Sequence, residues 1–402
     1  MANSILKSIG LTGTAITIII VSFLYTPVSF LIKKGGIFKD SFPLKTNFQL
    51  SCKPIPDLPA QCNDFAIHEE SSTSIYTCAQ NSIINFINNN EDIYLPPHLY
   101  NIETKKVSKL KIINFPEDKK VHFKNVKLYK PEESDKTLAF FINEDENGNT
   151  IEKFEYIPEN KEIVWKSTLK HNLIKYASDF TLVNENDLYI INKYNTNNKW
   201  MQLIDNALVK SNSKIVSCDE DSICKVVAKS IKGAGGIEIS RDKKIVFVSS
   251  SYSGTILTYE RKELTNSLRL SYTQNLDFIP GRLFYLSKKN ENVYAFGYRS
   301  FFGLTNRLFS TFIEKFIKLD FSIQSPLVLG KIVKNEGRNQ FYGVLFEWKT
   351  IMELEGELTN SNNIKDRDIS SLAIIKNDKV RKQSFGISWN EKTKPLVCNG
   401  FN

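Results

Sequence analysis

Histidine is scarce in this chain, and the signatures of several common active sites are missing. The 402 residues include only 4 His, and none of the 6 Cys forms a C-x-x-C pair, which argues against a zinc set. No G-x-S-x-G nucleophile elbow occurs. The glycine-rich run 233–240 lacks the G-x-G-x-x-G spacing of a phosphate-binding loop and precedes a strand pattern, so we interpret it as a turn.

Long runs of basic residues are also missing. The formal net charge is +9, but Lys residues are interspersed with Asp and Glu along most of the chain. Nucleic-acid binding needs a basic patch that follows the phosphates, so the charge pattern predicts no nucleic-acid partner.

The longest uncharged stretch, residues 11–32, predicts a membrane anchor. As a helix it would extend for about 33 Å, which is enough to cross the hydrocarbon core of a bilayer. The stretch ends at Lys33 and Lys34 without a small-residue cleavage site, so an uncleaved signal anchor is favoured over a cleaved signal peptide. The predicted organisation is a short tail (1–10), the anchor (11–32), a linker (33–50) and one ectodomain (51–402).

The six cysteines favour an oxidising compartment, although buried free thiols are the alternative. Cys218 and Cys224 flank a short polar turn that would bring them together. Cys52 and Cys398 lie at the two ends of the folded part, where a disulfide would close a ring, and Cys62–Cys78 is the remaining pair. An even count behind an anchor predicts a luminal or extracellular domain. The chain would then be a single-pass membrane protein of the secretory pathway, in the endoplasmic reticulum or at the cell surface.

The body of the chain is typical of an all-β repeat protein. Short runs rich in β-branched and aromatic residues alternate with polar turns, and turn-then-strand segments recur about every fifty residues. A β-sandwich would also give short strands, but this length and spacing favour a propeller. The predicted strands are 138–143, 162–166, 187–192, 244–249, 255–259, 292–296 and 372–375.

Two segments have helical periodicity instead. Residues 199–209 and 301–317 each place apolar side chains on one helical face. One interpretation is a helix packed over the propeller. The other is an interfacial helix on the lipid surface, with Trp200, Phe309, Phe312 and Phe316 contacting the membrane.

Several segments resemble the paraoxonase/arylesterase family. The run 168–189 (TLKHNLIKYASDFTLVNENDLY) is similar to the family's T-I-R-H…L-N-D stretch, and 226–249 is similar to its V-V-A…A-N-G-I…S-P-D segment. Cys52 and Cys398 fall where the family closes its ring with a disulfide. The resemblance implies a six-bladed β-propeller with one structural and one catalytic calcium ion in a central tunnel.

The resemblance also implies which residues would hold the two ions. Asp64 and Asp179 match the ligands of the structural calcium, so one calcium site is expected to persist. The catalytic calcium's ligands fall on Asn63, Ser178 and Gly235, with the last Asp-Asn pair near Arg282 and Leu283. Calcium takes six to eight oxygen ligands and favours carboxylates, so these replacements predict that the catalytic ion is lost.

The family's two catalytic histidines fall near Asn125 and on Glu144, and His122 lies three residues from the first. Two functional hypotheses follow. The first is a non-enzymatic, membrane-tethered propeller. By analogy with degenerate relatives of the family, its role would be an accessory or folding factor for membrane partners such as ion-channel subunits. The alternative is a calcium-dependent arylesterase or lactonase that uses Glu144, His122 and Asp179 in a rearranged site.

Overall fold

The computed structural model describes most of the chain between residues 51 and 298 and the backbone of five later strands. The described ranges are 51–59, 62–80, 93–145, 148–196, 213–276, 279–285 and 293–298, together with Tyr25, a few positions from 198 to 209, and the strands between 327 and 399.

These residues form six antiparallel sheets, one of which gains a parallel edge strand. In the order in which their strands pair, they are sheet A, β1 (Ser51–Pro54), β25 (Leu396–Asn399), β24 (Gln383–Ser388) and β23 (Ile369–Ile375); sheet B, β2 (Cys62–His68), β3 (Thr73–Gln80), β4 (Ile93–Asn101) and β5 (Val107–Lys109); and sheet C, β6 (Lys111–Ile113), β10 (Glu162–Leu169), β9 (Gly148–Ile157), β8 (Thr137–Asp145) and β7 (Phe123–Tyr129). The others are sheet D, β11 (Ala177–Leu182), β12 (Leu188–Asn192), β13 (Ser213–Cys218) and β14 (Cys224–Ile231); sheet E, β15 (Ala234–Ile239), β16 (Ile245–Ser250), β17 (Thr255–Lys262) and β18 (Ser267–Asn275); and sheet F, β19 (Ile279–Tyr285), β20 (Val293–Tyr298), β21 (Leu327–Asn335) and β22 (Leu345–Leu354).

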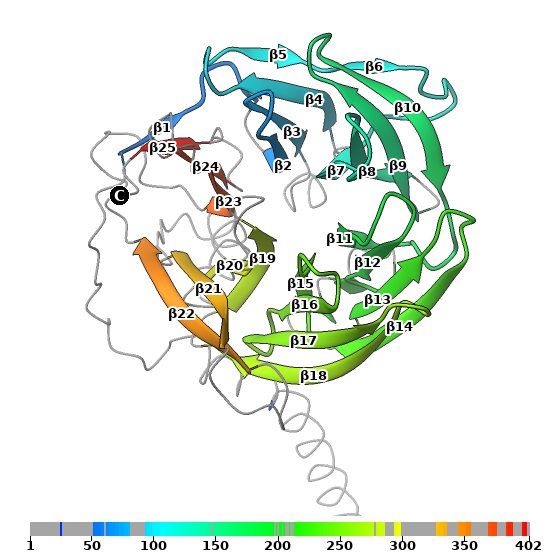
Figure 1. Cartoon of the computed structure of the whole chain (residues 1–402), viewed down its shortest axis with the longest axis vertical. Helices are drawn as coiled ribbons and strands as arrows, with labels where there is room; N and C mark the ends of the chain where they lie inside the picture. Colours follow the sequence, from blue (N-terminus) through cyan, green and yellow to red (C-terminus); the bar gives the residue numbers. More distant parts are fainter. Residues whose placement is uncertain are drawn as a thin grey trace, which may run out of the picture.

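The sheets follow one another around a common centre in a propeller-like arrangement (Figure 1). Their innermost strands β2, β7, β11, β15, β19 and β23 contact each other in sequence, and β2 returns to contact β23. Sheet A is shared by the two ends of the folded region, because β1 pairs with β25 and brings Cys52 opposite Cys398. All seven predicted strands are confirmed, as is the all-β propeller class.

The hydrophobic core lies between successive sheets. One cluster fills the space between sheets B and C around Phe123, Phe141 and Phe154, whose rings contact one another. Further clusters fill the spaces between sheets C and D, D and E, and E and F. Strand alternation explains this arrangement, because the inward and outward faces of each strand both meet a neighbouring sheet.

Two of the predicted disulfides are present. Cys218–Cys224 joins β13 to β14 and Cys62–Cys78 joins β2 to β3, each across directly opposed positions. The side chains of Cys52 and Cys398 lie outside the described residues, so their bond stays a prediction.

Other expectations cannot be compared with the structure in full. Within the described part of the chain, no helix has the length and apolar character needed to cross a bilayer. The predicted anchor lies outside that part except for Tyr25, and the segment 301–317 with Phe309, Phe312 and Phe316 lies wholly outside it. In 199–209, Met201, Gln202, Ile204 and Asp205 are helical, as predicted, whereas Trp200 is not described.

Candidate functional site at the ring centre

Every innermost strand is interrupted by a β-bulge close to its start. The pairing register shifts in β2, β7, β11, β15, β19 and β23 at corresponding places. The residues left out of register are Asn63, Lys124, Ser178, Gly235, Gly281 with Arg282, and Ser370. Bulges of this kind redirect side chains next to functional sites. We call the region that these bulges surround the ring centre.

Four bulge residues are positions that the resemblance assigned to the catalytic calcium. Asn63, Ser178, Gly235 and Arg282 come from four different sheets, and the bulges bring them to the same end of the innermost strands. Leu283 is different, because it is fully buried in the apolar cluster between sheets E and F. It therefore belongs to the core and not to the site.

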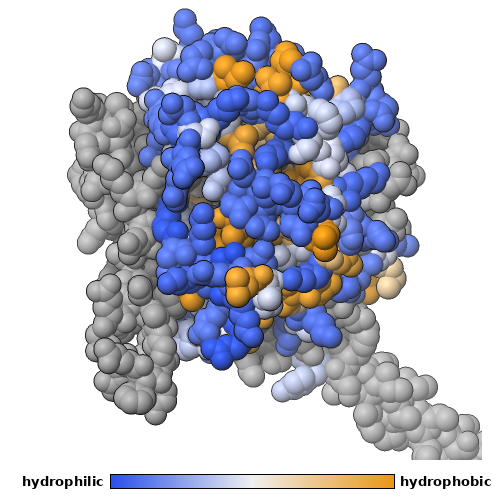
Figure 2. Space-filling view, turned by 45° about the vertical axis from the view of Figure 1, so that its right-hand side comes forward, coloured by the Kyte–Doolittle hydropathy of each residue, from blue (hydrophilic) through white to orange (hydrophobic). Residues whose placement is uncertain are grey.

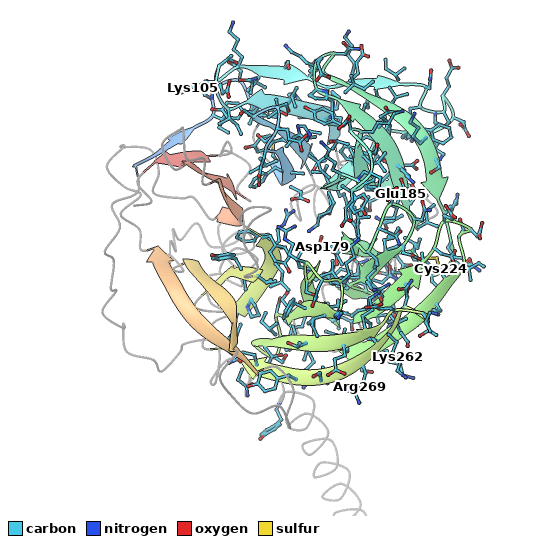
Figure 3. The ribbon with its side chains drawn as sticks, in the orientation of Figure 1. Lys105, Asp179, Glu185, Cys224, Lys262 and Arg269 are labelled. Atoms are coloured by element: carbon cyan, nitrogen blue, oxygen red, sulfur yellow. A yellow bond between two sulfur atoms is a disulfide. The ribbon has the colours of Figure 1, made fainter. Side chains whose placement is uncertain are left out.

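Asp64 and Asp179 follow their bulges directly and make equivalent hydrogen bonds. One carboxylate oxygen of Asp64 accepts the N–H of Phe65 (2.6 Å), and the other accepts the N–H of Val126 in β7 (3.0 Å). Asp179 accepts the N–H of the next residue, Phe180 (2.9 Å), and that of Ile237 in β15 (3.1 Å). Each aspartate thus ties its own strand to the innermost strand of the following sheet. Figure 3 shows Asp179 near the ring centre, while Cys224 lies at the outer rim.

Arg282 contacts Asp64 in a buried ion pair. Its guanidinium Nη1 meets Oδ1 of Asp64, whose side chain is 0% exposed, while the side chain of Arg282 is 14% exposed. Burial lowers the pKa of Arg282 to about 10, so the group stays protonated at neutral pH. Because sheet A stands between sheets F and B in the ring, this pair spans the ring centre.

A second ion pair joins sheets C and E beside Asp179. Lys127 Nζ lies 3.0 Å from Oε2 of Glu238, and Thr181 donates its hydroxyl to Oε1 of the same carboxylate (2.9 Å). Burial would lower the pKa of Lys127, but Glu238 and Asp179 outweigh it and raise this pKa. Burial raises the pKa of Asp179 to about 6, although Lys127 and the two N–H donors act against the shift.

Gly235 has no room for a ligand side chain. A Cβ at this position would lie 2.7 Å from Ser251 Oγ and 3.1 Å from Ser249 Oγ. These hydroxyls are engaged, because Ser251 donates to Pro280 O (2.6 Å) and Ser249 donates to Gly281 O. The space that the family's Asn would occupy is therefore filled by a serine pair that binds the bulge of β19.

His122 and Glu144 lie beside this region, on the β7–β8 side. The backbone of His122 donates to Asn143 Oδ1 (2.7 Å), and Glu144 forms an ion pair with Lys124 Nζ at 2.6 Å. Burial lowers the pKa of His122, with a smaller opposing effect from Glu144, so its imidazole is neutral at pH 7. Asn125 pairs in register with Ile142 in the same hairpin.

The ring centre fits calcium poorly. Among the described residues, no group of three or more His, Cys, Asp and Glu side chains gathers to hold a metal. Ser178 Oγ is buried and without a hydrogen-bond partner in that part of the chain, but one hydroxyl is a weak substitute for a carboxylate. A divalent ion about 4 Å from the guanidinium of Arg282 would be repelled by about 8 kcal/mol at an effective dielectric constant of about 20.

The fold and the bulge-lined centre define this chain as a propeller-like protein of the kind that carries its site on the axis. Residues 84–285, half of the chain, match the family model described as arylesterase. The chain therefore belongs to the arylesterase family, as a paraoxonase-like member. Proteins of this family are generally calcium-dependent.

Curated relatives agree with this assignment. The chain is 26% identical to serum paraoxonase/arylesterase 2 of Rattus norvegicus over 36% of its own length and 40% of the relative's. It is 29% identical to the protein of the same name from Canis lupus familiaris, over 35% and 39% of the two chains. The aligned part thus spans about two fifths of the relatives. A solved luciferin-regenerating enzyme aligns at 11% identity and a TM-score of 0.48, over 88% of this chain and 96% of that chain.

The sequence analysis missed the protein cations at the ring centre. It considered Arg282 only as a lost ligand, and it did not single out Lys124, Lys127 or Glu238. Lys127 and Glu238 are separated by 111 residues. Each lies in a strand of otherwise ordinary alternation, so only the ring geometry shows that they are partners.

Proposed function

We propose that this chain is a membrane-tethered, six-bladed paraoxonase-like propeller that has exchanged catalysis for binding of a membrane partner. In this proposal the six sheets are the blades, and sheet A closes the ring. The observation that supports it best is the pairing of Arg282 with Asp64, because a guanidinium occupies the charge position that a hydrolase of this family would give to a metal.

The packing around Gly235 supports the same proposal. Restoring the family's ligand there would displace Ser249 and Ser251 from their bonds to β19. Loss of the metal removes the charge that would polarise an ester carbonyl, and a lost general base costs about 10²–10⁴ in rate by itself. The accessory role for ion-channel subunits and the anchor at 11–32 are carried over from the sequence analysis as parts of the proposal.

The test is turnover of phenyl acetate and of a lactone by the purified full chain, in calcium and in chelator. We expect background rates in both, with an active serum paraoxonase/arylesterase as the positive control. Robust calcium-dependent turnover would overturn the proposal. For the tether, residues 11–32 are replaced by an unrelated membrane helix or by a cleavable signal peptide. Full cellular function of the secreted form would exclude a role that depends on the membrane.

A second candidate function is a paraoxonase-type hydrolase, which family membership supports. The neutral imidazole of His122 next to Glu144 is the observation in its favour, because it could accept a proton at pH 7. If turnover is found, His122→Ala and Glu144→Gln should each abolish it, while the exposed control Lys262→Ala should not.

A further inference from the structure

Protein cations offset most of the acidic side chains at the ring centre. Arg282 contacts Asp64, Lys127 contacts Glu238, and Lys124 contacts Glu144. Asp179 also lies within the electrostatic influence of Lys127. These are the charges that a bound metal would otherwise have to balance, since buried carboxylates persist only when they are paired.

The pairs also do the mechanical work that a central ion would do. The Arg282–Asp64 pair joins sheets F and B, which are not neighbours in the ring. The Lys127–Glu238 pair joins sheets C and E across sheet D, and Thr181 of β11 adds a hydrogen bond to the same carboxylate. Together the two pairs connect five of the six sheets at the axis.

The backbone is shaped to deliver Arg282. A Cβ on Gly236 would lie 2.7 Å from Leu283 N, 2.8 Å from Gly281 O and 2.9 Å from Arg282 Cα. Only glycine allows β15 to approach the bulge of β19 this closely. The serine pair of Ser249 and Ser251 binds the same bulge from the side, so the position of the guanidinium is supported on two sides.

From this arrangement we propose that Arg282 is a resident cation that takes the place of a metal ion on Asp64. Lys127 has the same role toward Glu238 and Asp179, so the ring centre is held together without calcium. This inference differs from the structural calcium that the resemblance implied at Asp64 and Asp179. It also stands apart from the proposed function, because a propeller could be calcium-free whether or not it is an enzyme.

The test measures the melting temperature of the purified full chain in millimolar calcium and in chelator. For the parent protein we expect the same value in both. Arg282→Met should lower it by several degrees in both conditions, because it leaves a fully buried carboxylate unpaired. Arg269→Met is the matched control, since the Arg269–Glu260 pair is exposed, with the Arg side chain at 72%, and its loss should change little.

A second variant tests the exchange of cation directly. Arg282→Asp returns a carboxylate to a place where the family has a metal ligand. We expect this variant to be strongly destabilised in chelator and partly rescued by calcium, with calorimetric calcium binding that the parent lacks. If it does not fold, Arg282→Asn is used in its place. A parent protein that binds calcium or melts earlier in chelator would overturn the inference, as would an Arg282→Met variant as stable as Arg269→Met.

Discussion

Asp64 and Asp179 hold the same structural position in two sheets that are separated by a third. Both follow a bulge, both accept the N–H of the next residue, and both accept an N–H from the following sheet. They differ in their cation, because Asp64 is in direct contact with Arg282 while Asp179 has only the neighbouring Lys127.

This difference predicts unequal effects of removing the two charges. Asp64→Asn would leave the guanidinium of Arg282 buried without its carboxylate, and breaking a buried pair in this way costs about 3–5 kcal/mol. Asp179→Asn should cost less, because burial already disfavours the charged form of Asp179. Chemical denaturation of both variants at neutral pH checks the order. Equal losses would contradict the assignment of Arg282 to Asp64 alone.

Asp179 should also give stability a specific pH dependence. Its pKa is 3.8 in the reference state and about 6 in the fold, so the folded protein binds this proton more tightly. The corresponding stabilisation is complete below about pH 4 and is lost as the pH rises through about 6, and its size is about 3 kcal/mol. The measurement is the free energy of unfolding of the parent minus that of Asp179→Asn across this range. A difference that does not change with pH would contradict the prediction.

The two adjacent glycines of β15 should respond differently to alanine. At Gly236 the added methyl group meets backbone atoms of β19, which cannot move independently, so we expect a loss of about 1–3 kcal/mol. At Gly235 it meets mainly the hydroxyls of Ser251 and Ser249, which can rotate away. Gly235→Ala should therefore be milder, and Gly235→Ala with Ser251→Ala milder still. Urea denaturation of the three variants checks this order.

The described disulfides should contribute unequally. Cys62–Cys78 spans 16 residues and Cys218–Cys224 only 6, so the former restricts the unfolded chain more. Replacing the first pair with Ala should cost about 3 kcal/mol, and the second less, although strain in the fold can change both values. Thermal denaturation of the two double variants measures this. Non-reducing peptide mapping of the same samples should also find Cys52 bonded to Cys398.

The sequence predicts the repeated strands well because each strand carries its own signal in its side-chain alternation and bounding turns. The cysteine pair around the 218–224 turn was predictable for the same reason, since the turn itself brings its ends together. The pairs at the ring centre were not. The contact between Lys127 and Glu238 depends on how three sheets pack, and no local pattern in β7 or β15 encodes it. Family likeness located Arg282, but only the structure shows that it is bound to Asp64.

The sharing of sheet A between both ends of the chain has a consequence for biosynthesis. β1 begins at Ser51, yet its partner β25 ends at Asn399, three residues before the last one. While the ribosome is still working, β1 and the growing sheets have an open edge, and such an edge invites pairing with other chains. Ring completion must therefore wait for release of the polypeptide. Loss of even the last few residues would leave a nearly finished protein exposed to aggregation and quality control.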